Sequence, residues 1–194
     1  ACSGQAIHIS DDQLRKLANG NHDLYNALDE LKDRFQQAPI LGSLIDPKGS
    51  IHQDELFALD WDEVGPLLDT VLRKNKEEEF DEVGIIAQGL AKAASLLVGK
   101  YHLVATNVPY LARGKQEQVL RAYCEKYHNE AKNDLATVFL DRCLQFCPTG
   151  GTTTVVLPQN WLFLTSYKAF RETMLKERTF NLIGRLGAKS FQTP

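Results

Sequence analysis

The residues best suited to chemistry lie in the stretch LVATNVPYLARGKQ, where an apolar run ends at Asn107-Val108-Pro109-Tyr110. The side-chain oxygen of Asn107 can accept a hydrogen bond from an exocyclic amino group, and a neighbouring backbone carbonyl can accept a second. Pro109 fixes its own φ and restricts Val108 before it, so these carbonyls are held in place. Tyr110 offers a flat face on which a base can stack. The segment suits an amine extruded into a pocket and presented to an electrophile, as base-modifying enzymes require.

These four residues also fit an ordinary strand-to-turn transition with a buried tyrosine, so the surrounding elements matter. From residue 99 onward, short apolar runs alternate with helical periodicity, and we expect strands and helices at 101–106, 131–146, 152–158, 166–177 and 180–187 in turn. Ser166 is the expected N-cap of the second helix. Strand, helix, strand, helix and strand at these spacings predict a parallel α/β sheet, half of a doubly wound fold. In such sheets ligands bind beyond the carboxyl ends of strands, where Asn107 lies.

Residues 1–98 are predicted to be mainly helical. Ser10 and Gln13 have the spacing of a capping box for a helix that ends at Gly20. A second helix runs from residue 22 to Pro39, with four apolar residues on one face: Leu24, Leu28, Leu31 and Phe35.

Two further helices are expected in this half. The first covers residues 53–74 and is broken or kinked around Gly65-Pro66. The second covers residues 77–99 and carries an apolar seam of six residues: Phe80, Val83, Ala87, Leu90, Ala94 and Leu97. Residues 39–50 read equally well as an edge strand or a loop.

Charge divides the chain near Gly99. Residues 1–98 carry 9 Lys/Arg and 18 Asp/Glu, a net −9, whereas residues 99–194 carry 13 and 7, a net +6, which together give the chain's −3. We therefore predict two segments, an acidic helical one at 1–98 and a basic α/β one at 99–194. The basic segment is the better candidate for contact with a polyanion, although two differently charged solvated surfaces would give the same count.

Composition places the chain among globular proteins. It has 194 residues, of which 43% are apolar and 24% charged. No apolar run approaches the roughly 18 residues that cross a membrane, and the N-terminus has no signal-peptide pattern. The four cysteines lack the spacing of a disulfide framework, which predicts a reducing, cytoplasmic location. The chain begins without Met and stops just after an expected strand, so we expect a piece of a longer protein.

Two other site types are disfavoured by the same residues. Cys143 and Cys147 are four apart on an expected helix, and Cys143 continues its apolar face, so we predict no metal site. A Ser-His-Asp hydrolase is disfavoured because no Gly-x-Ser-x-Gly elbow occurs.

The tetrapeptide resembles the catalytic fourth motif of S-adenosylmethionine-dependent amino-group methyltransferases, usually Asn/Asp-Pro-Pro-Tyr/Phe. The blocks TNVPYLARGKQ, AKNDLATVFLDRCLQF, GGTTTVVLPQNWLFLTSYKAFRETML and RLGAKSFQT follow the order of the later motifs in large adenine-N6 DNA methyltransferases. The chain is most similar to those of type IIG restriction enzymes and of BREX phage defence, well over 99–194 and loosely over 1–98. The resemblance implies a partial Rossmann-like methyltransferase fold preceded by a mainly helical segment.

The resemblance also implies roles around the target base. Asn107 would accept from the adenine N6 amino group, and the carbonyl of Val108 or Pro109 would share that task. Tyr110 would stack on the flipped adenine, and Phe191 matches the family's second aromatic wall on the other face.

Other matched residues would serve the cofactor and the DNA. Asp134 and Leu135 match a block whose helix packs against the adenine of S-adenosylmethionine. Gln159 and Asn160, after Pro158, would shape the target pocket and contact DNA.

The basic residues that follow the tetrapeptide have two interpretations, phosphate contact or a loop kept soluble by charge. We favour phosphate contact for Arg113 and Lys115 and leave Arg121, Lys126 and Lys132 open. Trp161 is expected to pack in the core rather than to contact a base.

Two departures from the family pattern stand out. Val108 replaces the first proline, which removes some rigidity but leaves Asn107 in place. The Gly-rich cofactor motif is missing, because ACSG at the N-terminus is followed by QAIHIS, which reads as a strand where that motif opens a helix. We expect the motif upstream of Ala1, so this chain alone would hold the cofactor poorly and be inactive.

The resemblance implies double-stranded DNA as partner, with other defence-system subunits possible, and exposed apolar faces would favour self-association of the piece. Two alternatives stay open. A methyltransferase acting on a protein glutamine amide or an RNA base shares the tetrapeptide, and a non-catalytic module could use the basic segment to bind DNA.

Overall fold

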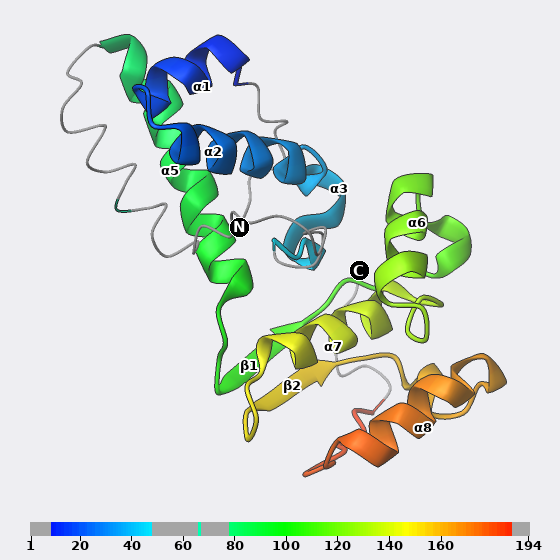
Figure 1. The fold of residues 1–194 in the computed structure, drawn as a ribbon. Helices are drawn as coiled ribbons and strands as arrows, with labels where there is room; N and C mark the ends of the chain where they lie inside the picture. Colours follow the sequence, from blue (N-terminus) through cyan, green and yellow to red (C-terminus); the bar gives the residue numbers. More distant parts are fainter. Residues whose placement is uncertain (1–8, 48–65, 67–77, 188–194) are drawn as a thin grey trace.

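A computed structural model describes residues 9–47, 66 and 78–187 (Figure 1). Most of the expected strand at 5–10, the expected helix at 53–74 apart from Pro66, and Phe191 lie outside these residues. Figure 1 shows a helical group joined through α5 to a second group built on two strands. None of the described helices is long and apolar enough to cross a membrane.

The helical group contains α1 (Asp11–Ala18), α2 (His22–Phe35), α3 (Ala38–Leu41), the 3-10 turn η1 (Gly42–Leu44) and α5 (Glu78–Val98). The predicted capping box is confirmed, since the Ser10 backbone N–H donates to Gln13 Oε1 at 2.9 Å and the Gln13 N–H donates to Ser10 Oγ at 3.3 Å. Asn19 caps the other end of α1 in the left-handed region at φ 46°, and Gly20 follows at φ 79°. Local chemistry therefore sets both ends of α1.

Helix α2 buries the predicted apolar face, and all four of its members lie in the core: Leu24, Leu28, Leu31 and Phe35. It ends at Phe35, before the predicted end at Pro39. Pro39 instead lies in the first turn of α3, where its missing N–H costs nothing. Residues 38–44 form α3 and η1, so the predicted edge strand is wrong and helical turns replace the loop as far as residue 44.

The apolar seam of α5 is confirmed where its side chains are described. Val83, Ala87, Leu90 and Ala94 are buried, and α5 packs against α1 and α2. The seam therefore closes the core of the helical group.

The second group contains β1 (Leu103–Asn107), η2 (Arg113–Lys115), α6 (Gln118–Tyr127), α7 (Leu135–Phe146), β2 (Thr152–Val156), η3 (Gln159–Leu162), η4 (Thr165–Tyr167) and α8 (Lys168–Glu177). Strands β1 and β2 pair in parallel, with Leu103 opposite Thr152 and Asn107 opposite Val156. Helix α7 lies along this pair (Figure 1) and contacts β2. The predicted parallel α/β arrangement is confirmed for these two strands.

Three details differ from the sequence-based expectation. Residues 180–187 have no regular structure, and Leu182 is 88% exposed there. A strand needs a hydrogen-bonded neighbour, and β1 is the only partner of β2 among the described residues. Ser166 lies in η4 and is not the N-cap of α8, which is Tyr167 without a side-chain cap bond. Helix α6 was not expected from the sequence. Only Leu120 and Cys124 on it are buried, so its apolar face is too short to give a clear helical pattern.

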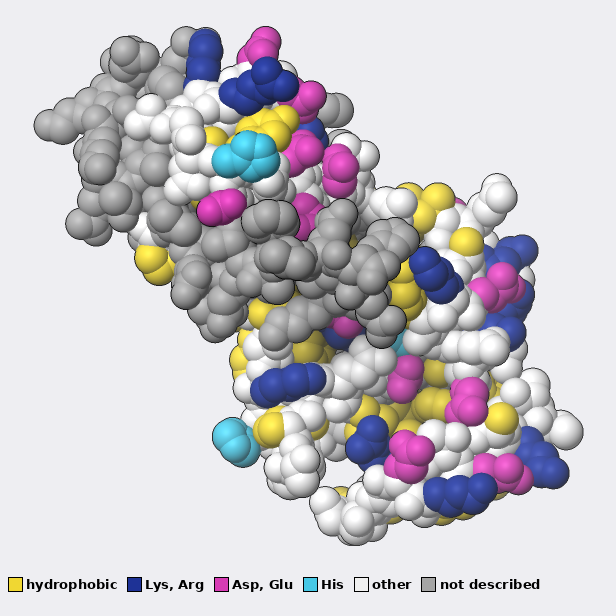
Figure 2. All heavy atoms as spheres, in the orientation of Figure 1, with side chains coloured by type: hydrophobic (Ala, Val, Ile, Leu, Met, Phe, Trp, Pro, Cys, Tyr) yellow, Lys and Arg dark blue, Asp and Glu magenta, His cyan; other side chains and the backbone are white. Residues whose placement is uncertain are grey.

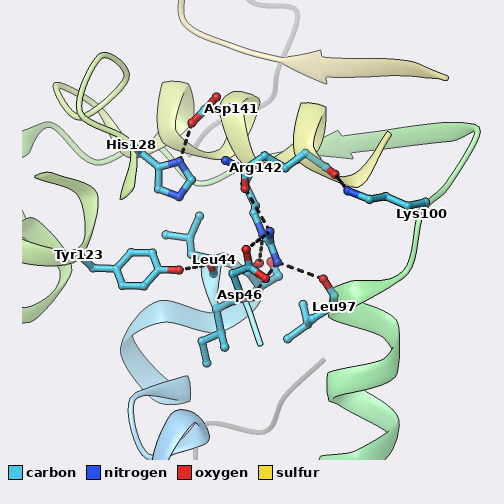
Figure 3. Close-up of polar contacts among 11 residues, drawn as sticks. Leu44, Asp46, Leu97, Lys100, Tyr123, His128, Asp141 and Arg142 are labelled. Atoms are coloured by element: carbon cyan, nitrogen blue, oxygen red, sulfur yellow. Dashed lines mark hydrogen bonds and ion pairs between the residues drawn. The ribbon is translucent and has the colours of Figure 1, made fainter. Parts of the chain in front are cut away.

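The two groups meet at Arg142, a charged side chain of α7 that is only 3% exposed (Figure 3). Its guanidinium donates to the carbonyl oxygens of Ile45 at 2.8 Å, Leu97 at 3.1 Å and Ser43 at 3.3 Å. The Asp46 carboxylate lies 3.7 Å away. Burial lowers the pKa of Arg142, and Asp46 opposes that shift. The Leu97 carbonyl lies in the last turn of α5, where helical carbonyls lack intrahelical partners, so Arg142 satisfies groups that packing would leave unpaired.

Two polar contacts near Arg142 hold helix α6, one to the helical group and one to α7. The Tyr123 hydroxyl on α6 donates to the Leu44 carbonyl at 2.6 Å, and burial raises the pKa of Tyr123 to about 12 (Figure 3). On α7, Asp141 binds the buried His128 ring at 2.7 Å. Helices α6 and α7 are thus both fixed against neighbouring segments.

Replacing Arg142 by Met should lower the free energy of unfolding by about 3 kcal/mol, because the carbonyls of Ser43, Ile45 and Leu97 lose their buried donor. Urea denaturation followed by circular dichroism measures the change. The same substitution at exposed Arg185 should stay within about 0.5 kcal/mol. Equal effects of the two substitutions would contradict this account of the junction.

Candidate functional site

The candidate site lies at the carboxyl edge of the strand pair. Asn107 is the last residue of β1 and is paired with Val156, the last residue of β2. The segments that leave the two strands, residues 108–112 and 157–161, therefore start side by side. This is the position at which open parallel sheets bind ligands.

The tetrapeptide presents its polar and aromatic groups at this edge. The Tyr110 hydroxyl lies 3.2 Å from Asn107 Oδ1 and 3.4 Å from the Val156 carbonyl oxygen, and it can donate to either. Tyr110 is 50% exposed, which disagrees with the ordinary turn interpretation in which the tyrosine is buried. Val108 is buried, whereas Pro109 is exposed. The segment thus anchors itself through Val108 and leaves the ring of Tyr110 accessible.

Asp134 and Leu135, the residues matched to cofactor contact, begin α7 directly beside this segment. Asp134 is the N-cap, and its Oδ1 accepts from the Ala136 N–H at 2.9 Å and from the Leu111 N–H at 3.4 Å. Leu135 is buried, and its N–H donates to the Leu111 carbonyl at 3.0 Å. Both residues therefore hold the chain that follows Tyr110.

A second pair of contacts extends this connection. The Arg113 N–H donates to the Asn133 carbonyl at 3.0 Å, and Ala112 forms an antiparallel bridge with Asp134. Gln116 Nε2 donates to the Leu111 carbonyl at 3.1 Å from a buried position. Gln116 was not singled out by the sequence, because a lone glutamine after a basic loop carries no pattern.

A cavity of about 260 Å³ opens between the segment after β1, the start of α7 and the segment after β2. Its lining comprises Ala112, Asn133, Asp134, Ala136, Thr137, Pro158, Asn160, Trp161, Leu164, Ser166 and Tyr167. The structure therefore brings Asn160 and Asp134 together, while Gln159 is exposed outside the lining. Trp161 packs edge-on against Phe170 with ring centroids 5.8 Å apart, which confirms its predicted core role.

The basic residues after the tetrapeptide differ in their surroundings. Arg113 forms an ion pair with Glu125 on α6, and Arg121 donates to the Gln116 carbonyl at 3.1 Å. Lys115 is exposed in η2. On the face seen in Figure 2, basic side chains alternate with acidic ones over α6 and α8. The positive charge of this half is thus dispersed on that face.

The three described cysteines, Cys124, Cys143 and Cys147, are free thiols. Burial raises the pKa of Cys124 to about 11 and also raises the pKa values of the Cys143 and Cys147 thiols. These thiols are therefore poor nucleophiles at neutral pH. No group of three or more His, Cys, Asp or Glu side chains in the described part of the chain is arranged to hold a metal ion.

A larger cavity of about 540 Å³ lies between the α2–α3 region and α6. Its described lining residues include Asp33, Arg34, Tyr123 and Lys126, and none of them belongs to the tetrapeptide. It is therefore separate from the site at the strand ends.

Comparison with known proteins identifies the family to which this sequence is similar. Residues 33–191 match the Eco57I restriction-modification methylase family. The adenine-specific methyltransferase PglX of Lacticaseibacillus casei (strain Zhang) is 29% identical over 168 residues, 85% of this chain and 13% of that protein. The adenine-specific methyltransferase BrxX of Escherichia coli O9:H4 (strain HS) is 28% identical over 177 residues, 90% of this chain and 14% of that protein.

The chain thus spans about one seventh of the length of these relatives. The family match includes both parallel strands, the tetrapeptide at their carboxyl edge and the helices that hold it. By the extent of that match, this chain belongs to the Eco57I restriction-modification methylase family.

Proposed function

We propose that this chain forms the target-base part of a longer DNA methyltransferase that transfers a methyl group from S-adenosylmethionine to the N6 amino group of adenine. The single observation that carries the proposal is the placement of Asn107 and a half-exposed Tyr110 together at the carboxyl edge of a parallel sheet. The relatives named as adenine-specific methyltransferases support the choice of adenine. The biological setting in this proposal is bacterial restriction-modification or phage defence, in the cytoplasm.

Asn107 orients the N6 amino group and reduces the delocalisation of the nitrogen lone pair into the adenine ring. Its Oδ1 accepts a hydrogen bond from one N6–H, while a carbonyl of Val108 or Pro109 accepts from the other. Two acceptors stabilise the positive charge that develops on nitrogen as it gains the methyl group. The new nitrogen–carbon bond would replace the methyl–sulfur bond of the donor, whose thioether is the leaving group. The nitrogen then loses one proton to solvent, so that the product is neutral N6-methyladenine.

Tyr110 supports both the base and the amide. Its exposed ring face is available for stacking on an extruded adenine. Stacking tolerates any base, so it adds affinity without discriminating between bases. When its hydroxyl donates to Asn107 Oδ1, 3.2 Å away, rather than to the Val156 carbonyl, it occupies one lone pair of Oδ1 and leaves the second for the substrate. In this way Tyr110 orients the amide before the base arrives.

S-adenosylmethionine, when bound, supplies an electrophilic methyl group. The described residues fit one edge of such a cofactor and do not enclose it. The cavity of about 260 Å³ beside Asp134 and Asn160 lies below the range of roughly 300–1,000 Å³ for pockets of drug-sized ligands. The Asp134 Oδ1 already accepts from two backbone N–H groups, so only its second oxygen, Oδ2, is left to accept from a cofactor hydroxyl. We propose that the Gly-rich motif and its acidic residue come from another part of the longer protein.

Double-stranded DNA is the proposed partner, together with other subunits of a defence system. Lys115 and Arg113, next to the tetrapeptide, would contact phosphates around the flipped base, and Gln159 and Asn160 would contact the DNA at the second strand end. Phosphate contacts add affinity that depends on salt and carry no sequence choice. Arg113 would have to exchange its partner Glu125 for a phosphate, whereas exposed Lys115 would not.

Replacing Asn107 by Ala in the full-length protein should lower methyl transfer by at least about 10²-fold, because one preorganised polar contact to the reacting nitrogen is lost. Labelled S-adenosylmethionine, duplex DNA and digestion of the product to nucleosides measure the transfer into N6-methyladenine. Exposed Asn181→Ala serves as the matched control and should retain full activity. Label that appears only in protein or RNA, or unchanged transfer by the Asn107 variant, would contradict the proposal.

Replacing Lys115 by Ala should reduce the slope of log binding constant against log salt by about 0.9, the value expected for one phosphate contact. The loss of affinity should be similar for all DNA sequences, since phosphates carry no base information. Fluorescence anisotropy of labelled duplexes at several salt concentrations measures the slope. Exposed Lys92→Ala on α5 should leave it unchanged, and equal slopes for wild type and Lys115→Ala would argue against this contact.

A further inference from the structure

We propose that Gln116 is a positioning residue for the methyl-transfer site, acting through the Leu111 carbonyl on the segment that carries Asn107 and Tyr110. The proposal rests on the methyltransferase function proposed above. Gln116 is six residues beyond Tyr110, yet its side chain turns back to the peptide that follows that tyrosine.

The polar groups of Leu111 are bound from two sides. Its carbonyl oxygen accepts from the Leu135 N–H at 3.0 Å and from Gln116 Nε2 at 3.1 Å, so both lone pairs of the oxygen are used. Its N–H lies 3.4 Å from Asp134 Oδ1. The chain that leaves Tyr110 is therefore held by the start of α7 on one side and by Gln116 on the other.

Burial makes the glutamine an unusual choice for simple space filling. Gln116 is 3% exposed, and its Oε1 is buried without a hydrogen-bond partner among the described residues. Burying an amide is unfavourable unless its groups are paired, and an apolar side chain of similar length would fill the space without that cost. What the amide adds is the donor that reaches Leu111.

Gln116 is itself held firmly. Its N–H donates to the Arg113 carbonyl at 3.2 Å across η2, and its carbonyl accepts from Arg121 Nη2 on α6 at 3.1 Å. Helix α6 is in turn tied to the helical group through the Tyr123–Leu44 hydrogen bond. A side chain anchored in this way can transmit a fixed position to the segment it holds.

Loss of the Gln116 donor should disturb the geometry of the site more than its binding of DNA. Without the donor of Gln116, Leu111 keeps one of its two carbonyl partners, and the Tyr110 ring and its hydroxyl are free to shift relative to Asn107 Oδ1. A displacement of about 1 Å at reacting groups can cost about 10²-fold in rate. DNA affinity, which sums phosphate contacts along the whole longer protein, should change less than the rate.

The test is Gln116→Met in the full-length methyltransferase, since Met has similar length and no donor. Gln118→Met is the matched control, because Gln118 is exposed at the start of α6. Single-turnover methylation at saturating S-adenosylmethionine and DNA should be about tenfold to hundredfold slower for Gln116→Met alone. Its DNA dissociation constant should stay within about twofold and its melting temperature should be unchanged. Hydrogen–deuterium exchange of residues 108–116 should be faster than in wild type.

Two results would overturn the positioning role. The first is a Gln116→Met rate within about twofold of wild type, or exchange of residues 108–116 that does not change. The second is a slower rate accompanied by equal losses of DNA affinity and melting temperature, which would assign Gln116 to general stability. A wild-type protein without methyl transfer would refute the proposed function and its positioning role, and the exchange data would still show whether Gln116 holds the segment.

Discussion

The buried guanidinium of Arg142 is the interaction on which the rest of this structure depends. It satisfies carbonyls from two segments far away in the chain, those of Ile45 and Leu97, at 2.8 and 3.1 Å. Because Arg142 lies on α7, the same contact fixes the helix whose first residues hold Leu111 and hence the tetrapeptide. Removing the charge would leave buried acceptors unpaired, which is costly wherever water cannot replace the lost donor.

The candidate site combines a rigidly held backbone with an accessible tyrosine ring. Parallel pairing aligns the ends of β1 and β2, so that Asn107 lies opposite Val156. Backbone contacts from Asp134 and Leu135 then hold the chain beyond Tyr110, while the tyrosine ring stays half exposed. Catalysis by orientation requires such preorganisation, because groups that must be ordered during the reaction add to its barrier.

Charge and packing divide this chain differently. Net charge changes sign near residue 99, and the assignment of separate segments to 1–98 and 99–194 stays a prediction. The family match runs from residue 33 to 191 and therefore crosses that point. The hydrogen bonds of Arg142 and Tyr123 cross it as well. The acidic helices thus pack directly on the elements that carry the site.

The sequence by itself determined what depends on near neighbours: the capping box of Ser10 and Gln13, the apolar face of α2 and the tetrapeptide. The alternation of strands and helices also predicted the parallel pair. The sequence also predicted the core role of Trp161. Only the tertiary structure decided the partners of Arg142 and Gln116, the helical form of residues 38–44 and the lack of a strand at 180–187. The reason is physical, since helix caps and periodicity act within a few residues, whereas a buried donor or a strand edge takes its partner from wherever the fold brings one.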